Sequence, residues 1–226
     1  MELLKLPYMT RETSKGELAR TVSALPNLRY VDLPDGVATG DPSCQPLLLE
    51  LQARCPHTRS ISYRNGAEGS FELLAQGRWQ NLEVLEISGL LIEPGTLRIV
   101  LASLPTLHDL TMSDLSWLDD SIFHSSPALP EFPPLQSLSL ENTPLVTAAG
   151  LQTYLSQPQN REILSNLTLN TTGVTATDLP TFLSMAIHLT SLTVVESVTG
   201  SIALTLTDLP PPVSYTHLTL PTKRIV

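Results

Sequence analysis

The fold of this chain is decided by the stretch Asn81-Leu82-Glu83-Val84-Leu85-Glu86-Ile87-Ser88-Gly89-Leu90. Its apolar residues Leu82, Leu85 and Ile87 have the spacing L-x-x-L-x-L. The last two alternate as on a half-buried β-strand, and the first anchors the turn that leads into that strand. Whether this spacing recurs along the chain therefore decides the architecture.

The spacing recurs along most of the chain. Further copies are Leu28, Val31, Leu33; Thr58, Ile61, Tyr63; Leu107, Leu110, Met112; Leu135, Leu138, Leu140; Leu164, Leu167, Leu169; Leu189, Leu192, Val194; and a weaker one at Leu3, Leu6, Tyr8. First positions at 3, 28, 58, 82, 107, 135, 164 and 189 give steps of 25, 30, 24, 25, 28, 29 and 25 residues. This is close to the leucine-rich-repeat period. We therefore predict an α/β leucine-rich-repeat solenoid, a horseshoe of about 7–8 repeats, with a parallel β-sheet on the concave face and helices on the convex face.

The segments between the predicted strands carry the apolar spacing of helices with one buried stripe. We expect helices at residues 14–24, 46–54, 71–75, 94–103, 148–156 and 177–187, the last of them capped by Thr177 or Asp178. Prolines interrupt the pattern between Leu115 and Pro134, where we expect one short turn around residues 117–123 and then a loop. Asp119-Asp120 is interpreted as the cap of that turn.

Composition and charge limit the classes of partner. The chain has 226 residues, of which 42% are hydrophobic and 15% charged, so it can bury a continuous core. The formal net charge of -9 argues against nucleic acid or an anionic membrane as the main partner. No secretory signal and no apolar run of the roughly 20 residues needed to span a bilayer is visible. We expect a cytoplasmic or nuclear protein that binds neither nucleic acid nor membrane.

The last residues of the sequence differ from the rest. Val213 to Thr222 resembles one reading frame of a sequencing-library adapter. We therefore expect residues 1–212 to form the leucine-rich-repeat domain, incomplete at both ends, and residues 213–226 to be a non-native tail. The alternative is that Thr216 to Leu220 forms one more strand, because it also has the pattern x-x-L-x-L.

No pattern in the sequence points to catalysis. Cys44 and Cys55 are too few for a disulfide framework or a zinc site and are interpreted as buried thiols. The histidines His57, His108, His124 and His188 lack the spacing of metal ligands, and no phosphate loop or nucleophile elbow is present. We expect no enzymatic activity, no catalytic residue, no metal and no cofactor.

A family resemblance comes from the turns that precede the strands. Residues 25–28, 55–58 and 104–107 read Leu-Pro-Asn-Leu, Cys-Pro-His-Thr and Leu-Pro-Thr-Leu, each leading into an L-x-x-L-x-L strand. The combination resembles the leucine-rich-repeat half of F-box proteins, particularly fungal ones, over about Leu3 to Pro212. This resemblance implies a protein-interaction scaffold that recognises the substrate of a ubiquitin ligase. The ligase adaptor would bind through an F-box, which is not visible in this sequence.

Polar residues between the strand leucines should face the concave side, where a partner would bind. The predicted partner-binding residues are Arg29, Tyr30, Asp32, Arg59, Ser62, Arg64, Glu83, Glu86, Asp109, Thr111 and Glu141. Arginine and tyrosine most often dominate binding energy, so Tyr30, Arg29 and Arg59 are the favoured anchors. The series runs from a basic start through an acidic middle to a hydroxyl-rich end, which suits a partner of complementary polarity.

Three other interpretations stay open at this point. The predicted partner-binding residues are equally well explained as ordinary solvated strand residues. The repeats also suit a regulator of an enzyme, such as a GTPase-activating or ribonuclease-inhibitor-like repeat protein, although those families have more regular repeats. The third interpretation is that the chain is a gene fragment with no function of its own. Repeat arrays need terminal caps for solubility, and this chain is expected to be incomplete at both ends.

Overall fold

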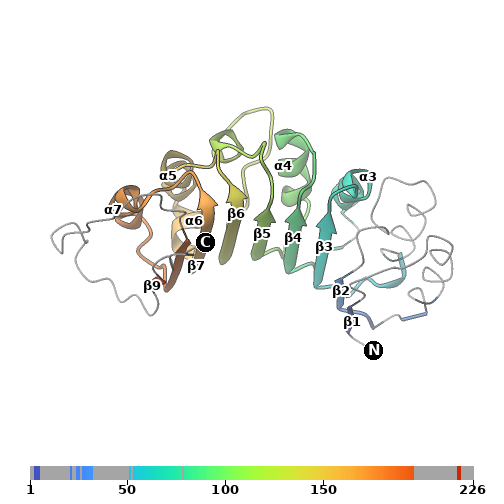
Figure 1. Ribbon diagram of the computed structural model, residues 1–226. Coiled ribbons are helices and arrows are strands. Elements are labelled where there is room, and N and C mark those ends of the chain that lie inside the picture. Colours follow the sequence, from blue (N-terminus) through green and yellow to red (C-terminus); the bar gives the residue numbers. More distant parts are fainter. Residues whose placement is uncertain are drawn as a thin grey trace, which may run out of the picture. The chain divides into compact units, whose positions relative to one another are not determined.

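A computed structural model describes residues 3–5, 21, 24–25, 27–32, 51, 53–77, 79–195 and 218–219. They form an α/β structure in which parallel β-strands alternate with short helices (Figure 1). The chain divides into two units. The first contains Met1–Leu110 and Ser126–Pro133, and the second contains Thr111–Ser125 and Pro134–Val226.

The strands of the first unit pair in parallel and in chain order. They are β1 (Leu3–Lys5), β2 (Tyr30–Asp32), β3 (Ser60–Arg64) and β4 (Val84–Ser88). Val31 pairs with Ile61, and Ile61 pairs with Leu85, which is the register that the repeat spacing predicts. At β1, however, Leu4 pairs with Val31 and Leu3 is 61% exposed. The weaker motif copy at Leu3, Leu6 and Tyr8 therefore had the wrong register.

The helices of the first unit follow its strands. They are α3 (Glu68–Glu72), the 3-10 helix η3 (Leu73–Gln76) and α4 (Pro94–Ala102). Helix α4 occupies the expected segment and starts with proline in its first turn, where no N–H is needed. It also buries Arg98, whose Nε donates to the carbonyl of Pro130 at 2.7 Å. The helices expected at residues 14–24 and 46–54 lie largely outside the described residues.

The second unit repeats the parallel arrangement. Its strands are β6 (Ser137–Thr143), β7 (Asn166–Thr172), β8 (Ser191–Val195) and β9 (Leu218–Thr219), while β5 (Asp109–Ser113) contributes residues to both units. Leu138 pairs with Leu167, Leu167 with Leu192, and Leu192 with Leu218. Strand β9 agrees with the alternative that residues 216–220 contain a strand. The adapter origin of residues 213–226 stays a prediction.

The helical segments of the second unit agree with expectation in part. They are η4 (Asp120–Phe123), α5 (Ala148–Ser156), α6 (Pro158–Ile163), η5 (Ala176–Asp178) and α7 (Leu179–Leu183). Helix α5 has the predicted bounds, and the Asp119 side chain caps η4 as expected. Helix α6 was missed. Asp178 is the N-cap residue of α7, as one of the two predicted alternatives, although its side chain makes no cap hydrogen bond there, and Thr175 caps the preceding η5.

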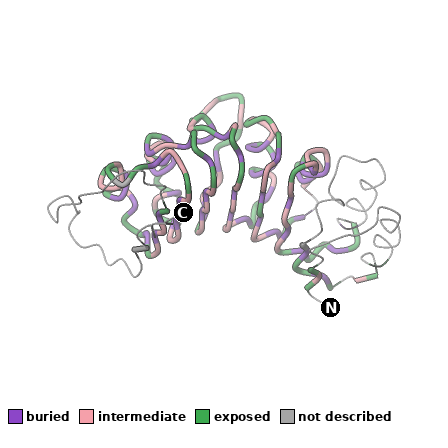
Figure 2. The backbone as a smooth tube through the Cα atoms, viewed as in Figure 1, coloured by how far each residue is buried: buried purple, intermediate pink, exposed green. Residues whose placement is uncertain are grey.

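The core combines the repeated apolar positions of the strands with the apolar residues of the helices (Figure 2). Leu82, Leu85 and Ile87 of the deciding stretch are each 0% exposed. Thr58 takes the place of the first leucine and is equally buried. Its hydroxyl donates to the carbonyl of Cys55 at 2.8 Å. A small polar side chain is tolerated there because the turn itself supplies the hydrogen-bond acceptor.

Candidate binding site on the strands of the first unit

Four ionisable residues lie side by side where the chain enters successive strands. The carbonyl of Arg29 accepts the N–H of Arg59 at 2.7 Å, and that of Arg59 accepts the N–H of Glu83 at 2.8 Å. The carbonyl of Glu83 in turn accepts the N–H of His108 at 3.0 Å. Backbone pairing therefore places these residues about one strand spacing apart, roughly 4.8 Å. We call Arg29, Arg59, Glu83 and His108 the charged row.

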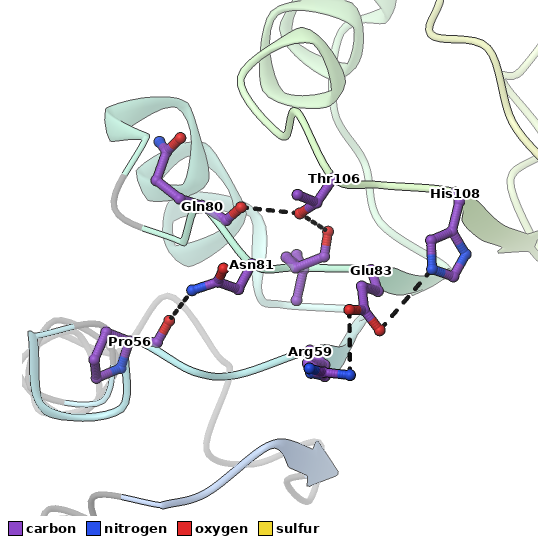
Figure 3. A network of polar contacts seen from close by, with 8 residues as sticks. Pro56, Arg59, Gln80, Asn81, Glu83, Thr106 and His108 are labelled. Atoms are coloured by element: carbon purple, nitrogen blue, oxygen red, sulfur yellow. Dashed lines mark hydrogen bonds and ion pairs between the residues drawn. The ribbon is translucent and has the colours of Figure 1, made fainter.

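The turns beside the charged row are tied together by polar side chains (Figure 3). Asn81 donates from Nδ2 to the carbonyl of Pro56 at 3.1 Å. The hydroxyl of Thr106 lies 2.9 Å from the carbonyl of Gln80 and 2.9 Å from that of Leu82. Each bond joins one turn to the turn before it, so the backbone under the row is held in a fixed arrangement.

The charges of the row are partly paired with one another (Figure 3). Arg59 Nη1 lies 3.4 Å from Glu83 Oε1, and His108 Nε2 lies 3.9 Å from Glu83 Oε2. His108 Nδ1 also lies 3.2 Å from Asp109 Oδ1. These side chains are between 32% and 45% exposed, so the pairs contribute little to stability, roughly 0–1 kcal/mol each. Their effect is to fix where each charge points.

A pocket of about 130 Å³ opens beside the row. It is lined by Arg29, His57, Arg59, Asn81, Glu83 and Thr106. Sites for drug-sized ligands and cofactors usually measure about 300–1,000 Å³. This pocket is therefore large enough for one side chain or a small ion, and it is too small for a typical cofactor.

The second unit shows that the fold does not require charges at these positions. The carbonyl of Gln136 accepts the N–H of Ser165 at 2.9 Å, and that of Ser165 accepts the N–H of Thr190 at 2.8 Å, the same backbone register as the charged row. The hydroxyls of Ser165 and Thr190 donate to the neighbouring carbonyl at 3.1 and 3.0 Å. These hydroxyls find their acceptors within the sheet, whereas Arg29, Arg59 and Glu83 carry charge to the surface.

The predicted site residues are only partly brought together. Tyr30 is 42% exposed and Glu86 is exposed, and the Glu86 carboxylate accepts the Ser62 hydroxyl at 2.6 Å. Arg64 is half-buried at the end of β3. Asp109 belongs to the first unit, whereas Thr111 and Glu141 belong to the second. The side chain of Asp32 lies outside the described residues.

Sequence reasoning missed three residues that line the pocket. His57, Asn81 and Thr106 each directly precede the first position of a repeat. Their shared place in the motif was a usable signal, because equivalent repeat positions stack along a sheet. The same signal places Arg59 beside Glu83, since each directly follows the first position of its repeat, but it does not show that their side chains pair.

The described residues offer little for other chemistry. No three His, Cys, Asp or Glu side chains among them are grouped so that they could hold a metal ion. In the same part of the chain, no helix combines the length and the apolar character needed to cross a membrane. The Cys55 thiol is buried and donates to the carbonyl of Leu25 at 3.4 Å, and burial raises its pKa. It is therefore poorly suited to act as a thiolate nucleophile.

A scan against protein-family models finds no match, and a search of curated proteins finds none.

Proposed function

We propose that this chain is a leucine-rich-repeat solenoid that binds a protein partner through the polar face of its strands. The centre of the interface would be the charged row together with Tyr30. The observation that carries the proposal is the contrast between equivalent positions. The first unit places two arginines, a glutamate and a histidine where the second unit has Gln136, Ser165 and Thr190. The fold accepts neutral residues there, so the charges are available for recognition.

The character of this face favours a protein over other partners. Tyr30 is 42% exposed beside Arg29, and both residue types are frequent anchors of protein interfaces. Charges of both signs lie within the row, which suits the mixed surface of a protein. The formal net charge of -9 disfavours a polyanion such as nucleic acid.

The finer proposal is that the partner is the substrate of an F-box-type ubiquitin ligase. It is supported by the turns at residues 25–28, 55–58 and 104–107, which resemble those of F-box repeat proteins. Expression from the complete natural reading frame tests this part. A ligase adaptor should copurify with that protein. An encoded protein with no F-box would contradict the ligase role while leaving partner binding untouched.

Partner binding is tested by comparing what variants retain from a cell extract. The double variant Arg29→Glu, Tyr30→Ala changes the face, and Arg161→Glu on α6 is the matched charge reversal elsewhere. We expect the wild type and Arg161→Glu to retain the same proteins, and the double variant to lose them at least tenfold. Circular dichroism should show all three folded. Equal retention by folded versions of all three would refute the proposal.

A further inference from the structure

The pocket beside the charged row is lined by one arginine that has no ion-pair partner among the described residues. Arg59 pairs with Glu83, whereas Arg29 is exposed and has no ion pair or side-chain hydrogen bond there. His57 is also exposed and has no such partner in the described part of the chain. Two groups that can donate hydrogen bonds therefore line the pocket with no acceptor among the residues that the structure describes.

Arg29 and Arg59 place two positive charges beside the same pocket. They directly precede neighbouring parallel strands, and the N–H of Arg59 donates to the carbonyl of Arg29 at 2.7 Å. Glu83 pairs with only one of the two arginines, because its carboxylate lies 3.4 Å from Arg59 Nη1 and 3.9 Å from His108 Nε2. Basic side chains are left facing one small pocket in a chain whose formal net charge is -9.

We propose that the Arg29 side of this pocket binds a single carboxylate from an acidic segment of the protein partner. The guanidinium of Arg29 would hold the carboxylate through paired N–H donors, with His57 beside it. The volume of about 130 Å³ suits one Asp or Glu side chain. This inference rests on the proposed function, since it names what the partner presents to that face.

A carboxylate suits the pocket better than a phosphate group. Glu83 also lines the pocket, so its charge repels any incoming anion. A phosphate monoester carries about -1.5 to -2 charge at neutral pH, so one unpaired guanidinium would leave part of its charge uncompensated beside Glu83. Only Arg29 is unpaired among the arginines of the pocket within the described residues, and one guanidinium matches one carboxylate in charge.

The test is a titration of the full chain with three short acetylated and amidated peptides that differ at one residue: glutamate, glutamine or phosphoserine. Binding is followed by NMR at the Arg29 Nε–H and the His57 ring. We expect saturable shifts with the glutamate peptide, binding at least tenfold weaker with the glutamine peptide, and weakening as salt increases. Arg29→Gln should reduce binding at least tenfold, and the matched control Arg161→Gln should not.

Several outcomes would overturn the inference. These are the absence of saturable shifts, equal binding of the glutamine peptide, unchanged binding by Arg29→Gln, and tenfold tighter binding of the phosphoserine peptide. Failure here is separable from failure of the proposed function. A partner whose retention depends on Tyr30 but not on Arg29 would remove only the carboxylate site. Peptide binding without any dependence of partner retention on the strand face would remove only the proposed function.

Discussion

At the scale of single residues, one backbone conformation recurs at the same place in successive repeats. Gly89, Asp114, Asn142 and Thr171 each lie seven residues after the first leucine of their repeat. All four have a positive φ, of 65°, 56°, 51° and 53° respectively. Glycine adopts this left-handed conformation freely, Asn and Asp tolerate it, and a β-branched residue does so only under strain. The position in the repeat, and not the local side chain, determines the conformation.

The strain at Thr171 leads to our first prediction. Replacing Thr171 with Asn should raise the free energy of unfolding by about 1 kcal/mol, because Asn tolerates the left-handed region better. Urea denaturation measures the change. Gly89→Ala is the comparison variant, in which we expect the opposite effect. The added Cβ would lie 3.5 Å from Asn65 Cβ, an ordinary contact distance, so the positive φ is the only unfavourable feature of the substitution. It should destabilise by about 1 kcal/mol. A destabilised Thr171→Asn protein would contradict this explanation.

At the scale of elements, the helix starts of the second unit depend on carboxylates. The Asp120 carboxylate accepts the backbone N–H of Thr147 at 2.7 Å and its hydroxyl at 2.6 Å. Asp178 accepts the N–H and hydroxyl of Thr175 at 3.0 and 2.6 Å, completing a capping box. Both satisfy donors that a helix start leaves without partners.

Because Asp120 lies against Gly150, we predict that a glycine-to-alanine substitution in this helix lowers the stability of the protein. Glycine to alanine inside a helix normally stabilises by about 1 kcal/mol. At Gly150 a Cβ would lie 2.8 Å from Asp120 Cγ, so the Asp120 side chain would have to leave Thr147. We expect Gly150→Ala to destabilise by about 1–2 kcal/mol through loss of these hydrogen bonds. Thermal melting measures it, with Gln152→Ala on the same helix as control. A stabilised Gly150→Ala protein would show that Asp120 moves without loss.

The Asp178 capping box gives a prediction about pH. Hydrogen bonds from the hydroxyl and then the N–H of Thr175 hold the pKa of Asp178 below its ordinary value of 3.8. The stabilisation is therefore complete above that value and is lost as the pH falls through the lower pKa of the folded state. Thr175→Ala should raise the pKa of Asp178 toward its ordinary value. NMR titration of the carboxyl carbon measures it, and an unchanged pKa would mean that Thr175 is not the cause.

At the scale of the whole molecule, strands depend most on their immediate neighbours. Ile61 pairs with Val31 and Leu85, and Leu167 pairs with Leu138 and Leu192, and these positions form the core of the two units. In stacked repeats, stability is approximately a sum of each repeat and its nearest interfaces. A local defect should therefore stay local.

This leads to a prediction about hydrogen exchange. Ile61→Ala should cost about 2–5 kcal/mol and speed amide exchange in β2, β3 and β4, while β7 stays protected. Leu167→Ala should show the reverse pattern. Mass-spectrometric exchange of both variants under native conditions measures this. Equal loss of protection in both units from either substitution would mean that the molecule unfolds as one cooperative block.

How far the sequence predicted the fold depended on how local each interaction was. Helix α5 was placed correctly because its apolar residues Leu151, Tyr154 and Leu155 have the spacing of one helical face within a short stretch of chain. Helix α6 was missed because it is only six residues long, too short for a periodic pattern. The register at β1 was wrong because leucines at residues 3, 4 and 6 fit two alignments, and only pairing with β2 selects one.

By itself the sequence determined the parallel α/β architecture and which strand positions are buried, because a repeated apolar spacing can be buried only by stacking equivalent segments. It also predicted that Arg29, Arg59 and Glu83 share one face, and each of them directly precedes its strand on that face. Tertiary structure alone decided that the side chain of Arg59 pairs with Glu83 and that Arg29 has no ion-pair partner among the described residues. It also decided that His57, Asn81 and Thr106 line the same pocket. The reason is distance: ion pairs and pockets depend on separations of a few ångströms between strands, which a pattern along one strand does not contain.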